Sequence, residues 1–254
     1  MGKGKKVAVV TGGASALGRD IARRLASDGY AVGVVDSDSA GGQAVAEAVG
    51  GVFVEHDMKD FAHAPEAMAK VAQALGGINV MVNCAAVSPT GASEDITMEE
   101  WDHVMDYNLK GMFFAIQAAV PYMKKNEDGG NIVNVSSMRA KQATGDHLLF
   151  GASKAAVSAM SRELATDLWR YNIKCNTVAP WDIFTPDDPR MQDENFVKQQ
   201  VGYLLTDRVV EPKDVSEVVS FLISDASYCI NAFEVPVDSG ANLVREKPVK
   251  SAYK

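Results

Sequence analysis

The chain has 254 residues, of which 47% are hydrophobic and 23% charged, and its 25 Lys and Arg against 33 Asp and Glu give a formal charge of −8. Such a composition argues against a disordered chain. The acidic balance argues against nucleic acid or an anionic membrane as the main partner, because both bind basic surfaces. No segment reaches the ~18 consecutive apolar residues of a membrane-spanning helix. Residues 1–6 also lack the apolar stretch of a signal peptide, so we expect a cytoplasmic protein.

Cysteine and histidine are sparse in this sequence. The three cysteines, Cys84, Cys175 and Cys229, form no CxxC pair, and the four histidines are scattered. Neither set has the spacing of metal ligands, so we expect reduced thiols and no metal site.

Short β-rich runs alternate with longer helical patterns from the start of the chain. Strands are predicted at residues 7–11, 31–35, 52–54, 78–82, 131–135, 173–178 and 233–237. Helices are predicted at residues 17–28, 43–49, 63–75, 101–125 (as one helix or a broken one), 150–170 and 215–224. This rhythm predicts an α/β fold with a doubly wound, Rossmann-like, mainly parallel sheet that has helices on both faces. With no linker or repeat, we expect one domain over residues 1–254.

Residues 179–212 interrupt the regular alternation and are rich in Pro, Asp and large apolar residues. Long loops in compact domains commonly serve as lids or binding elements. Ligands of such sheets bind beyond the carboxyl ends of the strands, where this segment would lie. We therefore expect a substrate lid at about residues 181–212.

A glycine-containing turn at residues 11–18 joins the first predicted strand to the first helix. Its glycines allow a pyrophosphate to approach the backbone, and the helix N-terminus supplies free N–H groups. A tight strand-to-helix connection would use the same residues, so the turn alone does not establish a cofactor site. The residues of this turn expected to bind a cofactor are Gly12, Ser15, Leu17 and Gly18.

Asp36 ends the second predicted strand, 18 residues after Gly18. A carboxylate there can accept hydrogen bonds from the adenosine ribose of NAD and would repel the 2′-phosphate of NADP. No Lys or Arg lies within the turn to bind that phosphate, so the sequence favours NAD. Polar residues after the third and fourth strands either line the same cleft or cap loops. The further cofactor contacts predicted are Asp57, Met58 and Asn83.

Together these motifs make the sequence resemble the short-chain dehydrogenase/reductase family in its compact NAD-binding form, from Val7 to about Asn242. The matching segments are residues 11–18, 83–86, 108, 136–137, 151–154, 176–180, 185 and 236–240. The resemblance implies that Thr185 and Lys154 also contact the cofactor, that the substrate is a small alcohol or ketone, and that the chain forms a dimer or a tetramer. The sequence departs from the family pattern at Ala16, Ala86 and Trp181, where the family usually has glycine.

The resemblance also implies a catalytic set of Ser137, Lys154 and Asn108, with a tyrosine four residues before the lysine. This sequence has Phe150 at that position. In the family the tyrosine exchanges a proton with the substrate while a hydride moves to or from the nicotinamide. Phenylalanine keeps the ring and loses the acid, and a general acid–base group contributes ~10²–10⁴-fold to rate. We expect impaired activity.

Four explanations of Phe150 stay open at the level of sequence. The chain is an engineered Tyr-to-Phe variant of a secondary-alcohol dehydrogenase, or another group carries the proton, with His147 the nearest titratable candidate. Alternatively, the protein catalyses a non-redox lyase or isomerase reaction on the same fold, or it is a pseudoenzyme that binds NAD. The residues expected to line the substrate pocket are Met138, His147 and Trp181.

Overall fold

A computed structural model describes residues 5–143 and 145–243, so both ends of the predicted 1–254 domain lie outside the described residues. Within these residues the fold is built on one seven-stranded sheet of order β3-β2-β1-β4-β5-β6-β7. Every pairing in it is parallel. The predicted Rossmann-like α/β sheet is therefore confirmed. The strands are β1 (Val7–Thr11), β2 (Ala31–Asp36), β3 (Val52–Glu55), β4 (Val80–Asn83), β5 (Gly130–Val135), β6 (Ile173–Pro180) and β7 (Glu234–Val237).

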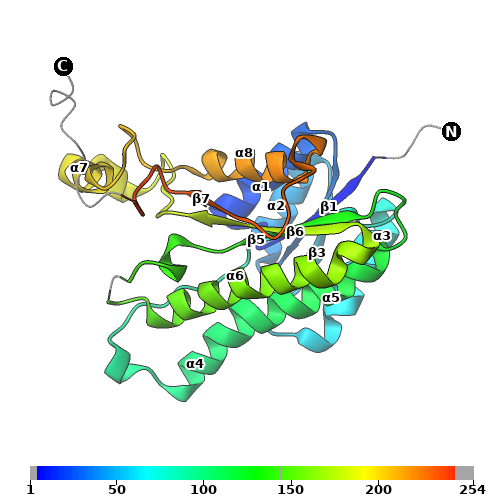
Figure 1. Ribbon diagram of the computed structural model, residues 1–254, viewed down its shortest axis with the longest axis horizontal. Helices are drawn as coiled ribbons and strands as arrows, with labels where there is room; N and C mark the ends of the chain where they lie inside the picture. The colour runs from blue at the N-terminus through cyan, green and yellow to red at the C-terminus, as the bar shows by residue number, and fades with distance from the viewer. Residues whose placement is uncertain (1–4, 144, 244–254) are drawn as a thin grey trace.

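Helices cover both faces of the sheet, as Figure 1 shows, with α1, α2 and α8 on one face and α3, α4, α5 and α6 on the other. Two apolar clusters fill the two interfaces between sheet and helices. This arrangement follows from the strands themselves, since β1 is buried at all five positions and can only lie in the interior. The helices are α1 (Ala16–Ser27), α2 (Ser39–Val49), α3 (Ala64–Leu75), α4 (Met98–Met105), α5 (Gly111–Met123), α6 (Leu148–Leu168), α7 (Glu194–Gly202) and α8 (Pro212–Ile223).

The strand order reverses between β1 and β4, which pair directly although two strands separate them in sequence. The connections after these two strands leave on opposite sides of the sheet, so a crevice opens beyond their carboxyl ends. The turn after β1 and the residues after β4 and β5 therefore meet at one edge of the molecule, where a ligand site is expected.

The helix predicted over residues 101–125 begins earlier, at Met98, because Thr97 and Glu100 form a reciprocal capping box. It is then continuous through a π-helical turn, Asp106–Lys110 (η3), into α5. The turn contains the predicted catalytic Asn108. A π-helical turn inserts an extra residue into the helix and is frequent at functional sites.

The segment 181–212 carries structure that the sequence pattern did not indicate. It contains a short 3₁₀ helix, Pro189–Gln192 (η6), and the helix α7, which Asp193 caps with its side chain. A single bridge between Ile183 and Val210 joins the two ends of the segment. In Figure 1, α7 lies at the end of the molecule, away from the other helices. None of the helices in the described part of the chain is long and apolar enough to cross a membrane.

Beneath the crevice, buried amides link neighbouring strands. Asn83 Nδ2 donates to Asn134 Oδ1 at 2.8 Å, which joins β4 to β5. Asn134 Nδ2 donates to Ser161 Oγ of α6 at 2.9 Å and to Cys175 Sγ of β6 at 3.6 Å. Because Asn83 and Asn134 are both 0% exposed, each depends on the other to satisfy its polar atoms.

We predict that Asn134→Ala lowers the free energy of unfolding by about 2–3 kcal/mol, because it leaves the Asn83 amide buried without its acceptor. Urea unfolding followed by circular dichroism measures this difference. The exposed Asn195 provides the matched control, and Asn195→Ala is expected to change stability by no more than about 0.5 kcal/mol. Equal effects of the two substitutions would contradict a structural role for the amide network.

Candidate active site

The turn after β1 is packed too closely for side chains at its glycines. Gly12 has φ +67°, and a Cβ atom there would lie 2.5 Å from the backbone N of Ala85. A Cβ atom on Gly18 would lie 2.1 Å from the carbonyl oxygen of Gly12. Ser15 caps α1, since its Oγ accepts from Gly18 N at 3.0 Å and donates to Gly12 O at 2.7 Å. The turn therefore presents bare backbone and a helix N-terminus, as a dinucleotide pyrophosphate requires.

Asp36 lies at the carboxyl end of β2, and its side chain is turned toward the glycine turn. Its Oδ2 accepts from Ala14 N at 2.9 Å and its Oδ1 accepts from Asp38 N at 3.0 Å. A carboxylate has about four acceptor positions, so these two bonds orient the group and leave acceptor capacity for the hydroxyls of a ribose. The residues present thus fit a dinucleotide at both its pyrophosphate and its ribose.

The other predicted cofactor contacts fall into different environments. Asn83 is buried and committed to the amide network, and the side chain of Met58 belongs to the core on the α3 and α5 face. Only the backbone of Met58 is left to contact a ligand. Asp57 is exposed, and its Oδ1 accepts from Lys59 N at 2.9 Å. Leu17 and Thr185 line the cavity described next.

A cavity of about 480 Å³ opens beyond the carboxyl ends of the strands, next to the N-terminus of α1. The turn before α1, the ends of β4, β5 and β6, the start of α6 and the segment 181–212 all contribute to its wall. Among its lining residues are Ser15, Leu17, Cys84, Ser137, Arg139, His147, Phe150, Lys154, Trp181, Asp182, Thr185 and Asp188. The predicted catalytic residues Ser137, Phe150 and Lys154 are therefore brought together. Among the described residues there is no cluster of side chains suited to a metal ion.

Lys154 is 2% exposed, and its Nζ donates to the carbonyl oxygen of Val135 at 2.7 Å. That oxygen lies at the end of β5. Burial disfavours the charged ammonium and lowers the pKa of Lys154 from its ordinary 10.5 to about 8. Within the described residues no other hydrogen bond of this Nζ is present, so two of its N–H donors remain for a ligand in the cavity.

Phe150 stands between two nitrogen-bearing side chains. The centroid of its ring lies 5.6 Å from Lys154 Nζ and 6.4 Å from the centroid of the His147 ring, which meets it edge to face. Phe150 lines the same cavity as Lys154, with its ring near the lysine ammonium. The ring itself offers the substrate no proton.

Ser137 and Asn108 take different places in the site. Ser137 is 9% exposed and lines the cavity, and its Oγ accepts from Arg139 N at 3.2 Å. Asn108 is 0% exposed; it exchanges two hydrogen bonds with the backbone of Val87, and its Nδ2 also donates to Ser153 Oγ at 3.0 Å. Asn108 therefore joins the segment after β4 to the first turns of α6 and positions Phe150 and Lys154 without lining the cavity.

Of the predicted substrate residues, His147 and Trp181 line the cavity, whereas Met138 is 1% exposed and lies beneath it. The Nε1 atom of Trp181 is buried and has no hydrogen-bond partner within the described part of the chain. Its indole lies 6.5 Å from the ring of Tyr203, near the end of α7. Trp181 therefore connects the end of β6 to the segment 181–212.

Two acidic residues of the site were not singled out by the sequence. Asp182 receives two hydrogen bonds from Arg139 Nη2, at 3.0 and 3.1 Å, across the wall of the cavity. Asp146 Oδ1 lies 2.6 Å from Nδ1 of His147. The only sequence signal for either is its position beside a residue already predicted, Trp181 or His147. Arg139 and Asp182 lie 43 positions apart, so only the fold brings them together.

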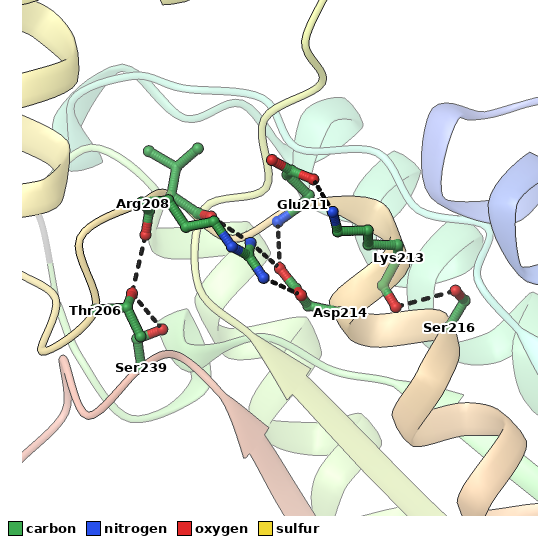
Figure 2. Close-up of polar contacts among 8 residues, drawn as sticks. Thr206, Arg208, Glu211, Lys213, Asp214, Ser216 and Ser239 are labelled. Atoms are coloured by element: carbon green, nitrogen blue, oxygen red, sulfur yellow. Dashed lines mark hydrogen bonds and ion pairs between the residues drawn. The ribbon is translucent and has the colours of Figure 1, made fainter.

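Ion pairs fix the end of the segment 181–212 to the start of α8, as Figure 2 shows. Arg208 donates to both carboxylate oxygens of Asp214 at 2.6 Å and thereby lowers the pKa of that carboxyl. Asp214 Oδ2 also accepts from Glu211 N at 2.9 Å. Thr206 Oγ1 donates to the carbonyl oxygen of Arg208 at 2.9 Å. These contacts hold this end of the segment in place against α8, as expected of the anchored end of a lid.

A family model described as enoyl-(acyl carrier protein) reductase matches residues 12–242. A curated relative, the 2,5-dichloro-2,5-cyclohexadiene-1,4-diol dehydrogenase of Sphingobium indicum, is 32% identical over 92% of this chain and 95% of its own length. The chain belongs to the short-chain dehydrogenase/reductase family. Short-chain dehydrogenases/reductases bind a nicotinamide cofactor, either NAD or NADP, which agrees with the fit of the glycine turn.

Two further short-chain dehydrogenase/reductase relatives bear on the cofactor and the fold. The NADP-dependent (R)-specific alcohol dehydrogenase of Lentilactobacillus kefiri is 32% identical over 92% of this chain and 96% of its own length. The crystal structure of a dehydrogenase/reductase from Sinorhizobium meliloti superposes with a TM-score of 0.85 at 30% identity, over 94% of this chain and 96% of that one. The relatives therefore support an oxidoreductase without deciding between NAD and NADP.

We predict that Lys154→Met raises the free energy of unfolding at pH 7 by about 1–3 kcal/mol, because it removes a buried ammonium. The folded chain loses this proton near pH 8 and the unfolded chain only near 10.5, so the unchanged chain gains stability as the pH rises between these values. The gain in the free energy of unfolding from Lys154→Met should therefore become smaller between pH 8 and pH 10.5. Urea unfolding at pH 7 and pH 10 measures it.

The exposed Lys59 provides the control for this prediction, because Lys59→Met removes an ammonium that water already solvates. A stability difference for Lys154→Met that stays constant from pH 7 to pH 10 would show that Lys154 titrates normally.

Proposed function

We propose that the chain is an NAD-dependent oxidoreductase that interconverts a secondary alcohol and a ketone by hydride transfer. The observation that carries this proposal is the meeting of Ser137 and Lys154 in one cavity beside the glycine turn. The relatives support it, since they include a diol dehydrogenase and an alcohol dehydrogenase. The substrate proposed is a small molecule, and the proposed location is the cytoplasm.

NAD would be held by the backbone of the turn at Gly12 and Gly18, by the N-terminus of α1 and by the carboxylate of Asp36. Its nicotinamide would supply the hydride acceptor or donor. Lys154 lines the cavity, and the N–H donors of its Nζ that make no hydrogen bond within the described residues can bind hydroxyl groups of the cofactor or the substrate. The Ser137 hydroxyl can donate a hydrogen bond to the substrate oxygen and thereby fix the reacting carbon.

Proton transfer is the slow step that we expect at this site, because Phe150 has no ionisable group. Impaired activity is therefore part of the proposal. The same observation favours a second candidate function, that of an NAD-binding pseudoenzyme or of a non-redox lyase or isomerase on this fold. The resemblance to the family also leads us to propose a homodimer or homotetramer, with no nucleic acid or membrane among its partners.

We predict that Phe150→Tyr raises the rate of alcohol oxidation by about 10²–10⁴-fold, because it restores a phenol beside the Lys154 ammonium. The measurement is NADH formation with NAD⁺ across a panel of secondary alcohols. Phe150→Leu serves as the control and should remain as slow as the unchanged chain.

The outcomes of this experiment separate the candidate functions. A Phe150 chain that already turns over alcohols as fast as Phe150→Tyr would overturn the argument on proton transfer. Binding of NADH without turnover by either form would favour the pseudoenzyme. Conversion of a substrate with no net change in nicotinamide absorbance would favour the lyase or isomerase.

We predict that the unchanged chain binds NADH at least about tenfold more tightly than NADPH, since the Asp36 carboxylate would repel a 2′-phosphate. Asp36→Asn keeps an acceptor oxygen and removes the charge, so it should weaken this preference by about tenfold. Isothermal titration calorimetry with both reduced cofactors measures the four dissociation constants. Tighter binding of NADPH by the unchanged chain would refute the assignment of Asp36.

A further inference from the structure

The first turn of α6 brings a histidine–aspartate pair to the cavity beside the ring that lacks a hydroxyl. His147 immediately precedes α6, and its ring lines the cavity and meets Phe150 edge to face at 6.4 Å. Asp146 Oδ1 lies 2.6 Å from His147 Nδ1. We propose that His147, oriented by Asp146, is the catalytic residue that exchanges a proton with the substrate in this chain. This inference rests on the proposed oxidoreductase function.

The contact with Asp146 decides which nitrogen of His147 is available. When Nδ1 carries a hydrogen and donates it to the carboxylate, Nε2 holds the free lone pair of a neutral imidazole. The carboxylate also stabilises the imidazolium that forms once Nε2 has taken up a proton. Asp146 is therefore a positioning residue that acts through His147.

His147 is also placed to exchange its proton with water. Its side chain is 20% exposed, whereas Lys154 is 2% exposed and is held by the Val135 carbonyl. A group that must release a proton to solvent after each turnover needs a path out of the cavity, which the partial exposure of His147 provides.

The remaining charged groups around the cavity are less suited to carry the proton. Arg139 cannot release a proton at ordinary pH and is paired with Asp182. The Cys84 thiol is buried, and burial raises its pKa to about 11. Asp188 is bound to Arg190, which lowers the pKa of its carboxyl. The charged residues that share the cavity lining with His147 are Arg139, Lys154, Asp182 and Asp188, and Lys141 lines the neighbouring hollow that His147 also borders.

In the direction of oxidation, the carbon–hydrogen bond of the alcohol breaks and its electron pair leaves with the hydride, which a bound oxidised nicotinamide would accept. The O–H bond breaks, its electrons form the second bond of the carbonyl, and its proton forms a new bond to Nε2 of His147. The imidazolium then releases this proton to water. Reduction of a ketone follows the same path in reverse.

The test compares His147→Gln, Asp146→Asn and Phe150→Tyr with the unchanged chain. His147→Gln is expected to lower the residual rate of alcohol oxidation by at least about tenfold. Asp146→Asn should lower it less and shift its pH profile. The double variant His147→Gln/Phe150→Tyr should recover to within about threefold of Phe150→Tyr alone, because the phenol then carries the proton.

The chain contains a matched control pair outside the cavity. His63 Nδ1 lies 2.7 Å from Asp60 Oδ1 on the exposed surface, so His63→Gln removes a similar pair and should leave the rate unchanged. A second readout does not depend on turnover. Addition of 2-propanol should shift the imidazole nitrogen signals of His147 in an NMR spectrum, with His147→Gln giving the assignment, and should leave those of His63 in place.

Each outcome decides the inference or the proposed function separately. If His147→Gln oxidises alcohols as fast as the unchanged chain, or if only variants with Phe150→Tyr show turnover, the inference is wrong and the oxidoreductase function stands. If even Phe150→Tyr converts no alcohol, the proposed function is wrong. If, in addition, the NMR signals of the His147 imidazole do not respond to 2-propanol, the inference is wrong as well.

Discussion

The hydrogen bond from Lys154 Nζ to the carbonyl oxygen of Val135 is the contact on which the site depends. It joins the second turn of α6 to the end of β5 and holds an amine at the edge of the sheet with almost no exposure to water. Phe150 lies in the first turn of the same helix and His147 directly precedes it, so α6 carries both rings to this edge of the sheet. The place where α6 begins therefore determines the part of the cavity wall that this helix forms.

The same packing explains why the Lys154 amine loses its proton more readily than a lysine in water. A lysine in water keeps its proton well above neutral pH, whereas burial brings the pKa of Lys154 to about 8. Such a lowered pKa, in a group that lines a cavity, is common at functional sites.

Much of the fold could be predicted because it follows from local patterns. The apolar run 7–11 matched β1 residue by residue, and the alternation of strands with helices led to the parallel sheet. Helix α7 was missed, because it is short, buries none of its residues fully and has a start that depends on the Asp193 cap. The π-helical turn at Asn108 was also not predicted, since a single such turn adds only one residue to an otherwise α-helical pattern.

The amino-acid sequence specifies the chemical groups of the site: a bare glycine turn, a carboxylate at the end of β2, a lysine four residues after position 150, and no hydroxyl on the ring at 150. Which of these groups meet depends on how the elements pack. The tertiary structure placed Ser137, Lys154 and His147 around one cavity, and committed Asn83 and Met58 to the interior. It also paired Arg139 with Asp182 across 43 residues of sequence. The physical reason is that spacing along a chain fixes neighbours within a helix or strand, whereas contacts between elements depend on how the buried faces of the sheet and helices pack together.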